Sequence, residues 1–422
     1  MQKNEHYISN LIFRLKEKGT VVWLESQMDD HPASTKSYLA ALPEAAIKAY
    51  GGEIHIQKEE KSVIHSNPWT ALQEFREEHD DWLFGYLGYD LKNFLEDLSS
   101  DNPKLNKAPD MYFIVPGLLL EFNKDGSFNI LKGELPDERE SPEAGKDFTI
   151  ELSNRMEESA YLNLVKKAQN DIFEGGYYEV NLSHPVEFTF KGDSFALYRS
   201  MKNTGPVPFG GYLTLDDLSV CCASPERFLA RKGKKVWSQP IKGTIPREPG
   251  KNADQNIEKL RSSEKERAEN LMIVDLVRND LSRISVKNSV KVSGLFEIQS
   301  FETVHQMVST VECEVKDEAD SIEVIKACFP MGSMTGAPKI AAMRAIEEYE
   351  NYQRGIYSGA LGYIKPDDDF DFNVIIRTAI IEENKLVYPV GGAITSDSDP
   401  KAEWEETLIK TRAITNILAK DE

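Results

Sequence analysis

Two pairs of glutamates recur at a spacing that suits a metal ion. Glu266 and Glu269 lie three residues apart on the helix expected over residues 264–282, and Glu403 and Glu406 lie three apart on the last helix. Each pair therefore shares one helical face, where like charges repel. Mg²⁺ prefers carboxylate oxygens and keeps several waters, so two such helices suit a magnesium ion whose free positions take a substrate carboxylate. The alternative is that both pairs belong to the solvated faces of glutamate-rich helices.

Lys242 stands in an unusual position for a lysine. Its segment, WSQPIKGTIPREPG, has the composition of a strand end and loop, where a small residue, an apolar residue or a solvated lysine is the ordinary expectation. Glu226 follows a strand earlier in the chain, and a hairpin would bring its carboxyl group to the amine of Lys242. In a cleft, these two groups form an acid and a nucleophile. A surface salt bridge between them is the alternative.

Two glycine-rich turns and one arginine suit an anionic ligand. The segment FPMGSMTGAPKIAAM, which contains Gly336, runs into a helix, and its backbone amides favour an anion, with Lys339 adding charge. Gly391 and Gly392 form a second such turn, and both turns are equally consistent with a purely structural role. Arg377 lies in the apolar strand FNVIIRTAII and needs a carboxylate partner, from a ligand or from an internal acid.

Composition excludes several classes of protein. The formal charge of −20 and the pI near 5.0 would repel nucleic acid and anionic membranes. The four cysteines have neither metal-ligand spacing nor disulfide density, and the adjacent pair Cys221 and Cys222 is predicted to lie in a buried strand. No segment resembles a signal peptide or approaches the ~18 apolar residues of a membrane span. We therefore expect a cytoplasmic protein.

The elements that position these residues indicate an α+β fold. Residues 1–135 are predicted to form a β-rich N-terminal region, residues 136–147 a linker or surface loop, and residues 150–422 a second domain. Helices are predicted at 159–175, 263–284, 337–350 and 401–420. Because strands and helices do not alternate strictly, the pattern favours α+β over a doubly wound parallel sheet.

Taken in order, nine segments between about residues 155 and 420 resemble the chorismate-utilising enzymes. This family includes anthranilate synthase component I, aminodeoxychorismate synthase component I, isochorismate synthase and salicylate synthase. The resemblance implies an α/β sandwich of two antiparallel sheets with outer helices, with the 150–422 domain binding chorismate and Mg²⁺. The segments are GYYEVNLS, SPERFL, PIKGTIPR, KERAENLMIVDLVRNDL, VHQMVST, PMGSMTGAPK, RGIYSGALGY, IIRTAI and AEWEETLIKTRA.

The resemblance also implies a role for each candidate residue. Glu226 matches the general acid that protonates the departing C4 hydroxyl, with its pKa raised by burial. The remaining assignments are Glu269 and Glu406 as main magnesium ligands, Glu266 and Glu403 as helpers, Tyr357, Arg377, Gly336, Gly391, Gly392 and Lys410 as substrate contacts, and Thr244 and His305 beside the ring.

Lys242 points to one branch of this family. In anthranilate synthases the residue before Gly-Thr is typically alanine, whereas in aminodeoxychorismate synthases it is lysine. The resemblance implies that the neutral amine of Lys242 attacks C2 of chorismate, and that ammonia then adds at C4 to give 4-amino-4-deoxychorismate, the precursor of 4-aminobenzoate and folate. The alternatives are an anthranilate synthase of tryptophan biosynthesis and a non-catalytic relative that binds chorismate or tryptophan.

Two further expectations concern partners and departures from the family pattern. No cysteine stands in a glycine-flanked nucleophile turn, so we expect a separate glutamine amidotransferase subunit in a heterodimer that supplies ammonia. Glu179 replaces a customary glutamine without an evident reason. Tryptophan is a candidate ligand of the N-terminal sheet through residues 23–26 and 206–209, although Gly205 and Val207 depart from the usual motif.

Overall fold

The computed structural model describes residues 2–28, 31, 36–58, 60–136, 147–247, 253–301 and 304–418, so most of the expected linker lies outside the described residues. The described strands are β1 Val21–Glu25, β2 Ser37–Tyr50, β3 Glu53–Gln57, β4 Lys61–His65, β5 Leu83–Leu87, β6 Met111–Phe122, β7 Phe128–Lys132, β8 Phe148–Arg155, β9 Glu179–Gly192, β10 Phe209–Leu215, β11 Leu218–Ser224, β12 Arg227–Lys232, β13 Lys235–Gln239, β14 Ile241–Pro246, β15 Lys291–Ser300, β16 Val304–Glu314, β17 Gly336–Ala337, β18 Ala360–Ile364, β19 Phe370–Val374, β20 Thr378–Glu382 and β21 Lys385–Ile394.

These strands form a continuous antiparallel sheet with two arms. One arm runs β8-β9-β21-β20-β11-β10-β1, the other runs β5-β18-β19-β12-β13-β16-β15, and β2 and β6 join them. Apolar side chains of both arms pack together in one core cluster, including Val220 and Leu361. Gly211 on β10 comes so close that a Cβ there would lie 2.5 Å from Leu361 Cδ2 on β18. The two arms therefore form a sandwich.

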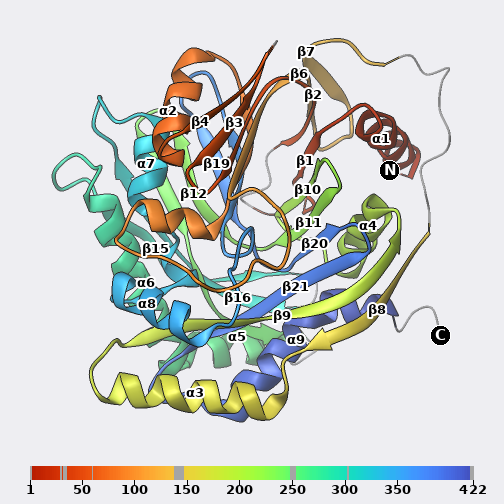
Figure 1. Ribbon diagram of the computed structural model, residues 1–422. Coiled ribbons are helices and arrows are strands. Elements are labelled where there is room, and N and C mark those ends of the chain that lie inside the picture. Colours follow the sequence, from red (N-terminus) through yellow and green to blue (C-terminus); the bar gives the residue numbers. More distant parts are fainter. Residues whose placement is uncertain are drawn as a thin grey trace.

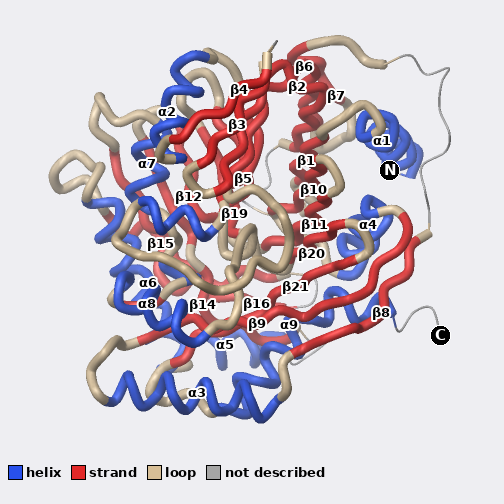
Figure 2. Tube along the Cα trace, viewed as in Figure 1, coloured by secondary structure: helices blue, strands red, loops and turns tan. Residues whose placement is uncertain are grey.

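Helices cover the outer faces of both arms (Figures 1 and 2). The described helices are α1 Gln2–Lys16, α2 Pro68–Glu78, α3 Glu158–Phe173, α4 Ser194–Thr204, α5 Ala253–Ser262, α6 Glu264–Ser282, α7 Ser321–Cys328, α8 Lys339–Tyr349 and α9 Pro400–Leu418. Helices α1, α4 and α9 share a core with the β9-to-β1 arm, and α2, α6 and α7 share a core with the other arm. No described helix is long and apolar enough to cross a membrane.

The predicted α+β class is confirmed, as are the four predicted helices, which appear as α3, α6, α8 and α9. Cys221 and Cys222 are buried on β11, as predicted. The prediction of a mostly β N-terminal region missed α1 and α2. The signal for α1 is the apolar stripe of Ile8, Leu11, Ile12 and Leu15, which recurs at helical spacing and packs onto the sheet.

The division into regions 1–135 and 150–422 stays a prediction. Strands from the two regions pair directly, since β1 pairs with β10 and β5 pairs with β18.

Candidate active site

Each acidic pair begins in the first turn of a capped helix, with Glu266 on α6 and Glu403 on α9, and its second member, Glu269 or Glu406, lies one turn further on. Ser263 Oγ accepts a hydrogen bond from the backbone N–H of Glu266 at 3.3 Å, which fixes the start of α6. Asp399 Oδ1 accepts one from the N–H of Ala402 at 2.8 Å and fixes the start of α9. Acidic residues are favoured in a first turn by the helix dipole, which partly offsets their mutual repulsion.

The structure brings the two pairs together. Lys265 Nζ lies 3.8 Å from Glu269 Oε1 on the same helix and 3.5 Å from Glu403 Oε1 on α9. Gly392 lies beneath them on β21, where a Cβ would be 3.4 Å from Glu403 Oε2 and 3.8 Å from Glu406 Oε1. A larger residue at this position would therefore fill space next to the carboxylates.

The carboxylates have the chemistry of a hard-cation site. Burial raises the pKa of Glu269 to about 7 and also raises the pKa values of Glu266 and Glu403. Glu269 Oε1 is buried and has no hydrogen-bond partner among the described residues. In the described part of the chain, no three His, Cys, Asp or Glu side chains are placed to hold a metal ion by themselves. These residues fit a magnesium ion that keeps waters or ligand oxygens in its other positions.

Lys242 is buried on β14 and forms an ion pair with Glu179. Its side chain projects where the pairing of β14 with β16 shifts register, and Gly243 has a φ of +89°. Nζ lies 2.6 Å from Oε1 of Glu179, the first residue of β9, and the two residues are 8% and 1% exposed. Burial lowers the pKa of Lys242, but the carboxylates of Glu179, Glu269 and Glu226 outweigh burial and raise it. The charges around Lys242 therefore favour its protonated form, and the neutral nucleophile implied by the resemblance stays a prediction.

Glu226 is buried in the turn between β11 and β12. Burial raises the pKa of its carboxyl group to about 7, against the opposing effects of a hydrogen bond with Ser333 and the charge of Lys242. Its backbone carbonyl accepts a hydrogen bond from Val374 N–H at 3.0 Å, which holds the turn against the neighbouring segment. The expected direct contact with Lys242 is not the one formed, because the lysine pairs with Glu179 instead.

Arg377 has a free guanidinium next to these groups. Its side chain is half-buried and makes no hydrogen bond or ion pair with a described residue, whereas its backbone carbonyl accepts a hydrogen bond from the N–H of Ala223 at 3.2 Å. Arg377 lies between β19 and β20 with a φ of +50°, so the expectation that it stands within a strand is wrong. Burial lowers its pKa, while Tyr388, Glu226 and Glu406 act in the opposite direction. An internal acid was one of the two partners expected for this arginine, and no described acid fills that role. Tyr357, the other side chain expected to bind the same carboxylate, is buried in the segment that precedes β18.

The predicted substrate contacts on β17, β21 and α9 have distinct structural roles. The expectation that Gly391 and Gly392 form a turn is wrong, because both lie within β21 and pair with β9. Lys410 Nζ donates to the carbonyl of Gly391 at 2.7 Å and forms an ion pair with Glu406 at 2.6 Å. Gly336 has a φ of +143°, and a Cβ there would lie 2.0 Å from the carbonyl oxygen of Glu179, so glycine lets β17 pack on β9. The charge of Lys339 is not available to an anion, because Nζ pairs with Asp280 at 2.6 Å.

Thr244 and His305 lie on adjacent strands. Thr244 Oγ1 accepts a hydrogen bond from Gln306 Nε2 at 3.2 Å. His305 Nδ1 is 2.7 Å from Ser300 Oγ, while its buried Nε2 has no partner among the described residues. Burial lowers the pKa of His305, so the imidazole is neutral at pH 7.

Sequence reasoning missed a buried network behind the site. The guanidinium of Arg354 bonds Glu350 Oε1 at 2.6 Å and Oε2 at 2.8 Å, and also the carbonyls of Asn181 and Met334. Glu350 Oε1 in turn accepts hydrogen bonds from the backbone N–H and the hydroxyl of Ser183. Glu350 and Arg354 lie beyond the last residue of α8, so their four-residue spacing is not a helical pair and the sequence offered no clear signal for this contact.

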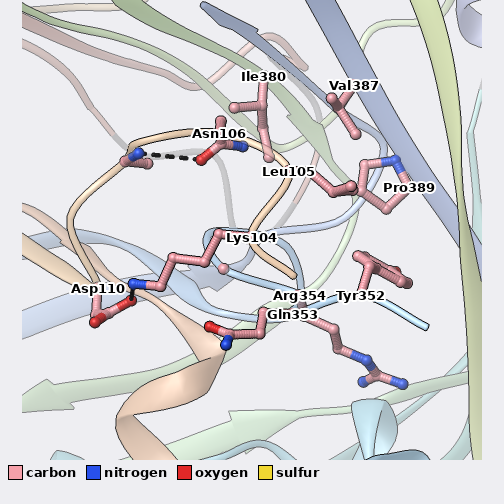
Figure 3. A pocket seen from close by; sticks show the side chains of 12 residues that line it. Lys104, Leu105, Asn106, Asp110, Tyr352, Gln353, Arg354, Ile380, Val387 and Pro389 are labelled. Atoms are coloured by element: carbon pink, nitrogen blue, oxygen red, sulfur yellow. Dashed lines mark hydrogen bonds and ion pairs between the residues drawn. The ribbon is translucent and has the colours of Figure 1, made fainter. Parts of the chain in front are cut away.

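Two further hollows lie away from the predicted site residues. One is bordered by Lys104, Asp110 and Gln353 and also by Arg354 of this network, and Lys104 forms an ion pair with Asp110 at 2.8 Å (Figure 3). None of the predicted site residues lines this cavity. The other is lined by parts of both segments expected to bind tryptophan, residues 24–26 and 208–209. Whether tryptophan binds there stays a prediction.

The sandwich brings together four glutamates, the buried Lys242–Glu179 pair and the unpaired guanidinium of Arg377, a set of groups that suits an anionic small molecule. The chain belongs to the chorismate binding enzyme family, whose model matches residues 19–416. Aminodeoxychorismate synthase component 1 of Escherichia coli (strain K12) is 31% identical over 96% of this chain and 95% of that protein. Anthranilate synthase component 1 of Aquifex aeolicus is 31% identical over 96% of this chain and 90% of that protein.

The fold is similar to that of a solved relative. The crystal structure of anthranilate synthase component I from Streptococcus pneumoniae superposes with a TM-score of 0.79 at 27% identity, covering 91% of this chain and 93% of that one. The roles assigned to individual residues from the sequence remain predictions.

Proposed function

We propose that this chain aminates chorismate at C4 to give 4-amino-4-deoxychorismate. Overall similarity does not separate this activity from anthranilate synthesis, since the E. coli and Aquifex relatives are equally identical to the chain. The observation that carries the proposal is Lys242, the residue that the resemblance associates with C4 amination. It is buried beside Glu179, and the charges of Glu226 and Glu269 act on it, so its amine belongs to the site rather than to the surface.

The reaction needs two substitutions. The neutral amine of Lys242 attacks C2 while the C4 hydroxyl leaves as water, with Glu226 giving the proton. Ammonia then adds at C4 and expels the lysine nitrogen, which leaves the ring double bonds as they were in chorismate. The elevated pKa of Glu226, about 7, keeps a proton on this acid near neutral pH.

The anionic substrate would be held by Arg377 and its neighbours and by a magnesium ion bound to the acidic residues. Arg377, with Tyr357 and the backbone at Gly391, binds the enolpyruvyl carboxylate, and an unpaired guanidinium suits this role. Glu269 and Glu406, with Glu266 and Glu403, would hold Mg²⁺. The bound ion would neutralise the ring carboxylate beside these acidic residues.

Ammonia comes from a separate glutamine amidotransferase subunit. A glutaminase requires an activated thiolate, whereas burial raises the pKa of Cys222 to about 11 and that of Cys313 to about 12. Burial also raises the pKa values of the Cys221 and Cys328 thiols. The isolated chain is therefore expected to use ammonium salts and to be inactive with glutamine.

Product identification tests this function. The purified chain is incubated with chorismate, Mg²⁺ and an ammonium salt, with and without an aminodeoxychorismate lyase, and the products are identified by chromatography and mass. The expected result is 4-aminobenzoate only when the lyase is present. Anthranilate, isochorismate or unchanged chorismate would overturn the proposal.

A further inference from the structure

Glu179 is the one acidic residue of the site that the reaction scheme above leaves without a role. It begins β9 and is 1% exposed, and its Oε1 lies 2.6 Å from Lys242 Nζ. Its second oxygen, Oε2, is also buried and has no hydrogen-bond partner among the described residues. The backbone of Glu179 is fixed by pairing with Ala337 on β17.

Burying an ion pair such as Lys242–Glu179 costs free energy, so we looked for a role that the charges serve. Removing two charges from water costs several kcal/mol per ion, and their attraction only offsets that cost when the geometry is good. The carboxylate of Glu179 would also repel a dianionic substrate bound beside it. A glutamine at this position would still accept a hydrogen bond from Lys242 without a second charge, so the carboxylate itself requires an explanation.

The nucleophile creates a need for a proton acceptor. Lys242 must lose a proton before its nitrogen attacks, yet the surrounding charges hold the proton on the amine. The charged groups that act on Lys242 are Glu179, Glu226 and Glu269, and Lys242 also acts on Glu266 and Glu406. Among the described residues, only Glu179 lies within ion-pair distance of Nζ.

We propose that Glu179 accepts the proton of Lys242 as the amine attacks and returns it when the amine leaves. This role rests on the proposed function, because it requires Lys242 to be the nucleophile. Glu179 touches the reacting nitrogen and is therefore a catalytic residue in this scheme.

The protons balance over the cycle. The Lys242 ammonium gives one proton to the Glu179 carboxylate, the neutral amine bonds to C2, and the C4 oxygen leaves as water with the proton of Glu226. Ammonia then bonds to C4, and the C2–N bond breaks. The released neutral amine recovers its proton from Glu179, and the C4 ammonium returns one proton to Glu226.

The test compares Glu179→Gln with wild type across a pH series, using kcat for 4-amino-4-deoxychorismate. In the variant, Lys242 must lose its proton to solvent, so the variant-to-wild-type ratio of kcat should rise about tenfold per pH unit between about pH 6.5 and 8.5. Near pH 7 the ratio should be about 10⁻² or lower. Titration of Glu226 affects both proteins and cancels in the ratio.

Matched variants complete the experiment. Glu187→Gln makes the same change on the same strand, at a glutamate paired with Lys385 at 2.5 Å, and should leave kcat unchanged at every pH. Glu179→Asp retains a carboxylate and should restore a ratio that does not depend on pH. Lys242 should also react with an acylating reagent at lower pH in Glu179→Gln than in wild type, a readout that needs no turnover.

Each other outcome overturns the proposal. A ratio that is low but flat with pH means that Glu179 only positions Lys242, and a ratio of one or more means that it only supplies charge. Failure of the proposed function is a different result, because wild type would then yield no 4-amino-4-deoxychorismate while the acylation difference would persist.

Discussion

Lys265 on α6 reaches across to Glu403 on α9, with 3.5 Å between Nζ and Oε1. The same nitrogen lies 3.8 Å from Glu269, so a lysine lies between the two acidic helices. A cation is thus already required there to relieve repulsion among the carboxylates.

Mg²⁺ should raise the Tm of wild type but not of Glu269→Gln. A ligand that binds only the folded state adds about 2.7 kcal/mol at a concentration of about 100 times Kd. The measurement is the shift in Tm on adding Mg²⁺ to each protein, with Glu264→Gln, an exposed neighbour on α6, behaving like wild type. An equal shift in Glu269→Gln would place the metal elsewhere.

Glu226→Gln should lower kcat by about 10²- to 10⁴-fold, because the C4 hydroxyl then leaves without a proton donor. In wild type, kcat should fall as pH rises through about 7, where Glu226 loses its proton. A Glu226→Gln variant with wild-type kcat would remove this residue from the mechanism.

The same carboxyl should make the stability of wild type depend on pH. In the folded protein the carboxyl group of Glu226 keeps its proton up to about pH 7, whereas the ordinary pKa of a glutamate is 4.5, so the free energy of unfolding falls as pH rises between these values. At pH 8, Glu226→Gln should be more stable than wild type by up to about 3 kcal/mol. Denaturant unfolding at pH 5 and pH 8 measures this difference, and equal differences at both pH values would contradict it.

Arg377→Gln should raise KM for chorismate by about 10- to 100-fold, because a hydrogen bond to a charged group contributes about 1.5–3 kcal/mol. Steady-state kinetics provide the measurement, and kcat should change less than KM. Arg278→Gln, an exposed arginine on α6, serves as the control. An unchanged KM in Arg377→Gln would show that another group binds the carboxylate.

The fold was largely predictable because its helices carry local signals. The helix from Glu264 to Ser282 has a serine cap followed three residues later by Glu266, and both features lie within one turn of sequence. The strand order was not predictable in detail. Pairing of β5 with β18 joins residues more than 270 positions apart, and no local pattern specifies such a partner.

The site was predictable residue by residue, but its contacts were not. Glu179 stood out in the sequence, yet its partner Lys242 is 63 positions away on another strand. A hairpin was expected to bring Lys242 to Glu226, because the sequence shows how far apart two residues are along the chain but not which strands pair. Likewise, Lys339 was predicted to bind an anion, whereas it forms an ion pair with Asp280 on α6.

The most direct test of covalent catalysis by Lys242 is to look for a chorismate-derived adduct on this residue. The protein is incubated with chorismate and Mg²⁺ without ammonia, quenched, digested and analysed by peptide mass. The Lys242 peptide should gain the mass of chorismate minus one water, and Lys242→Ala should form neither this adduct nor 4-amino-4-deoxychorismate. Formation of 4-amino-4-deoxychorismate by Lys242→Ala, or an adduct on a different residue, would contradict it.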